Sequence, residues 1–520
     1  MKNLKLYILA LGLFTAGLTS CDKELDLVDP NSPTTGTYWK TETQAFAGVT
    51  GIYNALITDG TYQRSFPGLT DSRGDDFRGD SPWGDLEQTG KFIIPNTSAP
   101  VQWIWRDLYM IVFRSNQVIQ NVGKLDPAVI RAEAKDRILG QAYFLRGLAY
   151  YNLVTTFKAV PLITVPPADQ NDYFPPTASE EALWNQIFSD FKSAEEMLPV
   201  SYDNVVGPDK GQKGRATKGA AAGMLGKAYL YKKEWQKAAD QFAKFFVAPL
   251  QGVYSLMSDY RDNFKATNEN NAESLFEVQF SAEGGSVANW TGEPNANWRQ
   301  FEAFSITYGM DGKGFSDYLP TKWIYDEYKV EKTTDNKSDP RLLATIASYE
   351  PADNSTTAYG VPWPHPQDRI YPRKYTYDGL GVPFETFEGG GINYRVLRYA
   401  DILLMYAEAL NELNRTPEAY PLIQQVRDRA KLPSLLVVKP GMNQTQMREQ
   451  IYHERALEFA IEGQRINDII RWGWLYDPAK LAMLKAHDAD FNTWTAGNEY
   501  LPIPQSELAT NKNLSPNSAN

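Results

Sequence analysis

The chain has almost no cysteine and very little histidine. Cys21 is the only thiol among 520 residues, and the three histidines, His365, His453 and His487, stand far apart. Zinc sites need several closely spaced His and Cys ligands, and cysteine hydrolases need a free thiol with a histidine partner. The sequence therefore favours neither a zinc centre nor a cysteine nucleophile.

Other signals of chemistry are also missing. No GxSxG nucleophile elbow occurs, and the glycine run Gly389 to Gly391 lacks the lysine and hydroxyl of a phosphate-binding loop. Asp335, Asn336 and Asp339 lie in TTDNKSDP, which lacks the glycine of an EF-hand loop, so we interpret this segment as a turn. We expect no metal ion and no cofactor. Carboxylates are plentiful, so a pair of acidic residues of the glycosidase kind stays open.

After its first 20 residues the chain has no long apolar run. Lys2 and Lys5 precede an uncharged stretch from Leu6 to Leu18. That stretch is too short to span a bilayer, which needs about 20 apolar residues, and its flanks are those of an export signal. Residues 1–20 are therefore predicted to be a lipoprotein signal peptide. Leu-Thr-Ser-Cys matches the bacterial lipobox, so Cys21 is predicted to be the lipidated first residue of the mature chain.

An acidic, proline-punctuated stretch follows the predicted lipidation site. Residues 21–36, CDKELDLVDPNSPTTG, have the composition of a flexible tether. Without residues 1–20 the chain has 50 basic against 63 acidic residues, a net charge of about −13. Polyanions select basic surfaces, so we expect no nucleic acid as a partner. The rest of the chain is expected to be attached to the membrane surface through the lipid anchor.

Two segments have the spacing of tetratricopeptide (TPR) repeats. GMLGKAYLYKKEWQKAADQFAKFF, residues 223–246, places small residues and aromatic rings at the offsets of a helical hairpin. Tyr229 and Phe242 are expected to fill the seam between its two helices. A weaker copy covers residues 398–430. Both segments are predicted to be helical hairpins.

Periodicity alone predicts further helices near residues 46–56, 131–154, 183–198 and 448–472. The last of these carries charges at spacings of three and four: Glu454, Arg455, Glu458, Glu462, Arg465 and Asp468. An acidic catalytic face is one interpretation. Pairing with each other and with neighbouring helices is the interpretation that the spacing favours.

Between the helical blocks the composition changes. Residues 254–393 are rich in Gly, Pro, Asn and aromatic residues, with short apolar runs such as Ser274 to Phe280. Such a length is too long for a connection, so it is predicted to be an ordered, loop-rich insertion with a few short strands. The expected fold class is mainly α, a TPR-like helical-hairpin scaffold. Its regions are 37–253, the ligand-binding insertion 254–393, and the C-terminal helices and tail, 394–520.

Seven blocks, in order, carry a family resemblance. They are the lipobox followed by acidic residues, AYFLRGLAYYNLV with PLI close behind, GRATKGAAAGMLGKAYLY, ESLFEVQF, YRVLRYADILLMYAEALNEL, ERALEFAIEGQRINDIIRWG and LPIPQSEL. Nearly end to end, the chain resembles the SusD/RagB-like proteins, lipid-anchored glycan-binding proteins on the outer surface of Bacteroidetes. The resemblance implies a surface-exposed outer-membrane lipoprotein that captures an oligosaccharide and acts as a lid for a SusC-like TonB-dependent transporter, without catalysis. A surface glycoside hydrolase and a SusD-like binder of peptides are the alternatives.

Aromatic residues in the loop-rich segments are the candidate ligand-binding positions. A sugar ring needs an exposed aromatic platform with short polar groups at its edge. Three segments offer both: residues 71–85, 287–300 and 361–371. The predicted ligand-binding residues are Asp75, Asp76, Arg78, Trp83, Trp290, Asn297, Trp298 and Trp363. Packing of each tryptophan against the helical scaffold is the alternative.

Overall fold

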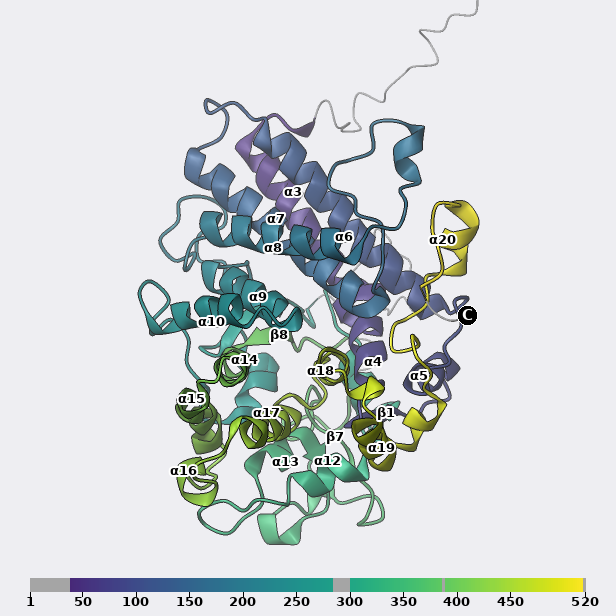
Figure 1. Cartoon of the computed structure of the whole chain (residues 1–520), viewed down its shortest axis with the longest axis vertical. Coiled ribbons are helices and arrows are strands. Elements are labelled where there is room, and N and C mark those ends of the chain that lie inside the picture. Colours follow the sequence, from purple (N-terminus) through teal and green to yellow (C-terminus); the bar gives the residue numbers. More distant parts are fainter. Residues whose placement is uncertain (1–37, 284–299, 386–388, 518–520) are drawn as a thin grey trace, which may run out of the picture.

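The computed structural model describes residues 38–283, 300–385 and 389–517 (Figure 1). The predicted signal peptide, Cys21 and the tether lie outside the described residues, as do Trp290, Asn297 and Trp298.

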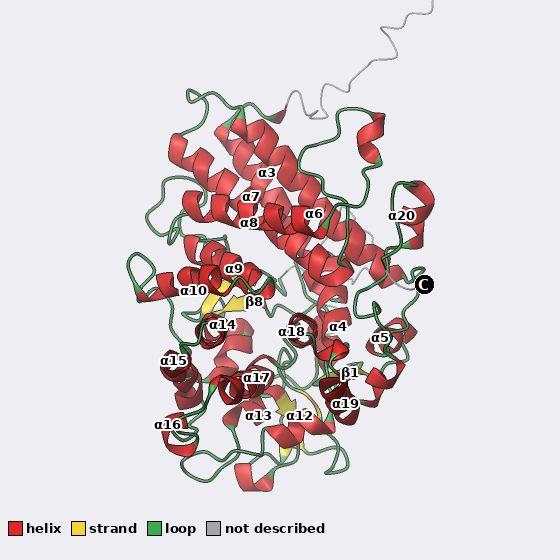
Figure 2. Ribbon diagram, viewed as in Figure 1, coloured by secondary structure: helices red, strands yellow, loops and turns green. Residues whose placement is uncertain are grey.

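Helices dominate the described residues, and the strands are short (Figure 2). The predicted mainly α fold class is confirmed. The helices are α3 (Glu42–Asn54), α4 (Ser65–Asp71), α5 (Gly84–Gly90), α6 (Ala99–Gly123), α7 (Ala132–Phe157), α8 (Glu180–Met197), α9 (Lys218–Tyr231), α10 (Trp235–Ala243), α11 (Phe304–Tyr308), α12 (Lys322–Glu327), α13 (Pro340–Thr345), α14 (Tyr399–Glu412), α15 (Thr416–Arg429), α16 (Leu435–Val438), α17 (Gln444–Phe459), α18 (Arg465–Trp472), α19 (Pro478–His487) and α20 (Gln505–Thr510).

Both predicted hairpins are present, as α9 with α10 and as α14 with α15. In the first hairpin a Cβ on Gly226 would lie 2.5 Å from the ring of Phe242, so only glycine allows the two helices to approach this closely. The α3, α6, α7 and α8 helices form the upper part of the molecule in Figure 1, and α12 and α13 of the insertion lie at the opposite end. The TPR-like spacing therefore predicted the two helical hairpins correctly.

The prediction of one continuous helix over residues 448–472 was wrong. The segment divides into α17 and α18, with a break around Ile461 and Gly463, whose φ angles are +57° and +67°. The Gly463 N–H donates to Asp71 Oδ1 at 2.6 Å, and the Ile461 N–H to Asp76 Oδ2 at 3.4 Å. Partners from the N-terminal region thus hold the break in place.

The charges of this segment pair as predicted. Glu458 is 2.5 Å from Arg429 and 3.0 Å from Arg398. Arg455 bridges Asp401 and Asp468, at 2.7 Å from each. These ion pairs are buried and join α14, α15, α17 and α18, so they hold helices together and offer no acidic face to a ligand.

Short antiparallel strands lie within the insertion and between the insertion and the scaffold. The pairs are β1 (Phe77–Gly79) with β3 (Tyr318–Pro320), β2 (Ser274–Val278) with β8 (Tyr394–Arg398), β4 (Ile346–Ala347) with β7 (Tyr371–Pro372), and β5 (Thr357–Ala358) with β6 (Val361–Pro362). One hydrophobic core includes Phe46, Leu225, Phe276 and Leu404. The insertion therefore packs into the same core as the helices on either side of it.

In the part of the chain that the structure describes, every helix is either too short or too polar to cross a membrane.

Candidate functional site

A turn after β1 presents Trp83 at the surface. The Asp80 N–H donates to the Asp317 carbonyl at 2.9 Å, and the Ser81 hydroxyl donates to the Asp317 carboxylate. The Trp83 N–H in turn donates to Ser81 Oγ at 2.9 Å. Trp83 is half-buried, and the Arg64 guanidinium lies 4.6 Å from its ring centre. The tryptophan is thus held in place while part of its surface remains open to solvent.

Residues 310–317, which we call the 310–317 loop, connect this turn with two other loops. The Glu385 N–H donates to the Lys313 carbonyl at 2.9 Å, and His365 Nε2 lies 3.0 Å from the Asp311 carbonyl oxygen. The segment at Asp80, the segment at His365 and the segment at Glu385 therefore all contact one loop.

Each of these segments carries an aromatic residue within three positions along the chain of its contact with the loop. We call the four residues Trp83, Phe315, Trp363 and Phe384 the aromatic rim. Phe315 belongs to the loop itself and is 43% exposed, and Phe384 is 58% exposed. Trp83 and Trp363 are half-buried. Partly exposed aromatic residues on segments that meet at one loop suit the binding of a sugar ring.

Glycine allows the tight start of the 310–317 loop. A Cβ on Gly309 would lie 2.4 Å from Cγ of Glu385 and 3.0 Å from Cα of Gly314. Gly312 has a φ of +74°, in the left-handed region that glycine favours. The loop therefore keeps its shape only with glycine at these positions.

Two buried carboxyl groups lie behind the rim. Tyr359 OH donates to Glu385 Oε1 at 2.5 Å, and the Tyr377 N–H donates to the same oxygen at 2.8 Å. Burial raises the pKa of Glu385 to about 8 and the pKa of Glu302 to about 7. The two residues are 1% and 0% exposed, so neither carboxyl group meets a ligand at the surface.

Arg78 lies in β1, and Trp363 packs against a cluster that includes a residue of β3. Arg78 is opposite Leu319 in the strand register and is exposed. Trp363 packs against the small apolar cluster that contains Leu319 and Met310, and its indole N–H donates to the Pro366 carbonyl at 3.2 Å. Both predicted residues are therefore near the 310–317 loop.

Asp75 and Asp76 are placed differently from the prediction. Asp75 is 0% exposed; its oxygens lie 2.5 and 3.0 Å from Arg465 and 2.7 Å from His487 Nδ1. Asp76 is 2% exposed, and burial raises its pKa to about 7. The expectation that these carboxyl groups hold sugar hydroxyls does not agree with this burial, because their neighbours are other protein groups.

The remaining predicted residues, Trp290, Asn297 and Trp298, lie outside the described residues and stay predictions. The described residues on either side of the segment that carries them are hydrogen-bonded to each other and to Gly390. The Ser281 N–H donates to the Gln300 carbonyl, and the Glu302 N–H donates to the Gly390 carbonyl at 2.9 Å.

Two rim residues, Phe315 and Phe384, were not predicted. Both stand in glycine- or proline-containing stretches, GKGFSDY and GVPFETF, that resemble the flagged tryptophan segments. The same criterion, an aromatic residue between loop-forming residues, would have found them if phenylalanine had been considered beside tryptophan.

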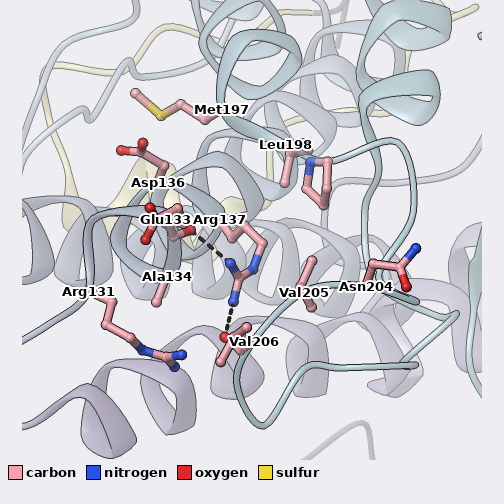
Figure 3. Close-up of a pocket in the computed structure, with 11 residues that line it drawn as sticks. Arg131, Glu133, Ala134, Asp136, Arg137, Met197, Leu198, Asn204, Val205 and Val206 are labelled. Atoms are coloured by element: carbon pink, nitrogen blue, oxygen red, sulfur yellow. Dashed lines mark hydrogen bonds between the residues drawn. The ribbon is translucent and has the colours of Figure 1, made fainter. Parts of the chain in front are cut away.

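A cavity of a different character lies away from the rim (Figure 3). It has a volume of about 650 Å³ and lies between the start of α7 and the loop after α8. Its lining has no aromatic ring, and Arg137, which points into it, is 2.8 Å from Asp209 and donates to the Val206 carbonyl at 2.9 Å. The cavity therefore offers a sugar no stacking surface.

No group of three or more His, Cys, Asp or Glu side chains is arranged for metal binding among residues 38–283, 300–385 and 389–517.

Comparison with known proteins decides the family. A model described as "SusD family" matches residues 272–519, and a model described as "Starch-binding associating with outer membrane" matches residues 52–230. The chain belongs to the SusD/RagB-like family. The first match contains Phe315, Trp363 and Phe384, and the second contains Trp83. The aromatic rim thus joins the two family-defining parts of this SusD-like chain.

Individual relatives are similar in sequence to this chain along nearly its whole length. SusD-like protein P2 of Formosa agariphila is 26% identical, over 99% of both chains. A SusD superfamily structure from Bacteroides vulgatus is 26% identical, with a TM-score of 0.77 over 92% of this chain and 99% of that one. A structure named as a laminarin-binding SusD-like protein is 27% identical, with a TM-score of 0.73 over 92% of this chain and 100% of that one. The predicted family and TPR-like fold are confirmed.

Proposed function

We propose that this SusD-like protein captures oligosaccharides at the cell surface and breaks no bond in them. The aromatic rim is the observation that carries the proposal. A pyranose presents a face of C–H groups that stacks on aromatic rings, with hydroxyls at its edge. Arg78, Asp80 and Asp311 are exposed and belong to segments at or next to the 310–317 loop, so they offer donors and acceptors for those hydroxyls. The similarity to a laminarin-binding protein supports the same ligand class.

Location and partner follow from the sequence and the family. The lipobox supports lipidation at Cys21, and one matching family model is described as associating with the outer membrane. We propose that the protein is anchored on the outer surface of the outer membrane and serves as a lid for a SusC-like TonB-dependent transporter. In that arrangement the protein would contribute to uptake by binding the sugar and releasing it to the transporter.

The capture role is tested by calorimetry on residues 22–520 with plant, microbial and host glycans. Trp83→Ala and Phe384→Ala are each expected to weaken binding about three- to tenfold, because a stacked aromatic pair is worth about 0.5–1.5 kcal/mol beyond its buried area. Val437→Ala, a change at a side chain that is 76% exposed on α16, is the control and is expected to bind like the wild type.

Two results would contradict the proposal. Release of shorter sugars from the ligand over hours would make the protein a glycoside hydrolase. Binding of peptides, with no glycan bound, would leave the family assignment intact but change the ligand class.

The anchor and the partner need a separate experiment. Cys21→Ala, expressed in the native host, is expected to release the protein from the outer membrane and to reduce its co-purification with a TonB-dependent barrel. Equal membrane retention of the variant and the wild type would rule out Cys21 as the anchor.

A further inference from the structure

A second group of exposed aromatic rings lies away from the rim. It surrounds a cleft of about 350 Å³ between α6, residues 161–175 and the C-terminal segment around α20. We call it the α6 cleft. In Figure 1, α20 (yellow) lies beside α6, and Gln102 Nε2 donates to Ser506 Oγ at 2.9 Å between them. The lining includes Trp105, Tyr109, Phe113, Tyr173, Phe174 and Glu507.

The walls of the α6 cleft are fixed by hydrogen bonds. Tyr109 OH on α6 donates to the Pro161 carbonyl at 2.8 Å. From the other side, Asn511 Nδ2 donates to the Pro175 carbonyl at 2.7 Å. Both ends of the 161–175 segment are therefore tied to neighbouring elements, so the cleft is already formed before a ligand arrives, as most small-molecule sites are.

The aromatic side chains of the cleft are unusually open to solvent. Phe113 is 50% exposed, Tyr173 is 64% exposed and Phe174 is 41% exposed, while Trp105 is buried at the base. Large apolar surfaces gathered at one place on a soluble body usually mark a binding site, because exposing them to water costs free energy.

The polar groups of the α6 cleft select the kind of ligand. Its basic residue, Arg106, donates from Nε to Asp107 Oδ1 at 2.7 Å. Asp172 and Glu507 are acidic, and burial raises the pKa of Glu507 while a hydrogen bond from Trp105 opposes the rise. An anionic ligand would meet two carboxyl groups and an arginine that is already paired. A neutral ligand with a flat C–H face and hydroxyls meets rings and hydrogen-bond acceptors.

We propose that the α6 cleft is a second carbohydrate-binding site, which takes a short stretch of a neutral sugar chain. The ligand class rests on the function proposed above, whereas the position of the cleft does not. Its volume lies at the small end of ligand sites, which span roughly 300–1,000 Å³, so it suits a few sugar rings at most. Two sites on one surface protein strengthen attachment to a long polysaccharide beyond either site alone.

The test is calorimetry of residues 22–520 with maltohexaose, laminarihexaose, cellohexaose and mannohexaose, and with polygalacturonate as the anionic probe. The cleft variant is Phe113→Ala with Tyr173→Ala, and the rim variant is Trp83→Ala with Phe384→Ala. Leu436→Ala with Val437→Ala removes equally exposed apolar groups from α16 and is the matched control. Because the cleft side chains are exposed, their removal is not expected to unfold the protein.

The wild type is expected to bind a neutral hexasaccharide at two sites, and the cleft variant to lose one of them or to weaken it at least about threefold. The rim variant keeps the cleft site, and polygalacturonate does not bind at the cleft.

Three outcomes would overturn this inference. If the cleft variant titrates like the wild type while the rim variant loses binding, the α6 cleft is no sugar site and the proposed function stands. If the wild type binds none of these neutral hexasaccharides, the inference about the α6 cleft falls, whereas the proposed function falls only if the wider glycan panel also fails to bind. If the cleft variant loses only its association with a purified partner protein, the cleft is a protein-docking surface. If only the cleft variant loses glycan binding, the α6 cleft is supported as a sugar-binding site, and the aromatic rim is no longer the binding site of the proposed function.

Discussion

Replacing Asp75 by asparagine is expected to destabilise the fold and to leave the ligand site untouched. Asp75 is fully buried, bonded to Arg465 at 2.5 and 3.0 Å and to His487 at 2.7 Å. Burial alone would raise its pKa, but Arg465 and His487 outweigh burial and lower the pKa to about 2. The variant therefore leaves Arg465, whose side chain is 6% exposed, as a buried charge without its carboxylate.

The expected loss in the free energy of unfolding is obtained in two ways. A fall in pKa from 3.8 to about 2 corresponds to about 2.5 kcal/mol of stability, at about 1.4 kcal/mol per pH unit. Removing one partner of a buried ion pair costs about 3–5 kcal/mol. Asp75→Asn should therefore lower the free energy of unfolding by about 2–5 kcal/mol at pH 7. Because the folded pKa is the lower one, the carboxylate's contribution is present above about pH 4 and disappears as the pH falls toward 2.

Denaturant unfolding of residues 22–520, followed by circular dichroism and tryptophan fluorescence, measures this loss. A chain of this size need not unfold in one step, so the first transition is compared. Asp240→Asn, the same change at an exposed position on α10, is the control and should stay within about 0.5 kcal/mol of the wild type. A variant as stable as the wild type that fails to bind glycan would refute the reasoning, because the carboxylate would then contact the ligand.

Three other changes test the region behind the rim and the half-buried histidine His453. Burial raises the pKa of Glu385 from 4.5 to about 8, so the wild type should lose stability between pH 5 and pH 8 as this buried carboxyl group ionises. Glu385→Gln should not show this loss. If the melting temperature of the variant falls between pH 5 and pH 8 as much as that of the wild type, the explanation is wrong. Gly309→Ala, whose Cβ would lie 2.4 Å from Glu385 Cγ, should displace the 310–317 loop and weaken glycan binding with little change in circular dichroism; calorimetry showing unchanged affinity would contradict it. His453→Gln should be destabilising near pH 6 and nearly neutral near pH 9.5. Burial lowers the histidine pKa, but bonds to Glu327 and Glu331 raise it to about 9, so its contribution is full below about pH 6.5 and lost through about pH 9. Denaturant midpoints at the two pH values measure this, and an equal effect at both would contradict it.

The helical scaffold could be predicted because its signals are local. Gly226 and Phe242 meet across a hairpin whose helices are neighbours in sequence, so their spacing alone predicts their contact. The break between α17 and α18 had no such signal. The positive φ angles at Ile461 and Gly463 depend on hydrogen bonds to carboxylates from the N-terminal region.

The same reason explains why Asp75 was assigned to a ligand. Its neighbourhood, RGDDFRGD, has the composition of an exposed turn, where Gly and Asp are common. What buries it is a partner, Arg465, almost at the other end of the chain. A charged residue in a turn-like stretch can become the centre of an ion pair whenever the fold brings an arginine to it, and no local pattern reveals this.

The aromatic rim shows why the family is easier to identify than the ligand. Two of the contacts around the 310–317 loop are backbone to backbone: Asp80 N–H to the Asp317 carbonyl, and Glu385 N–H to the Lys313 carbonyl. Such bonds hold whatever side chains the neighbouring positions carry. The aromatic side chains at Trp83 and Phe384 can therefore be exchanged without moving the frame that presents them, whereas the helical motifs are constrained by packing. Changes at the rim should alter which sugar is bound while the scaffold that defines the family stays the same.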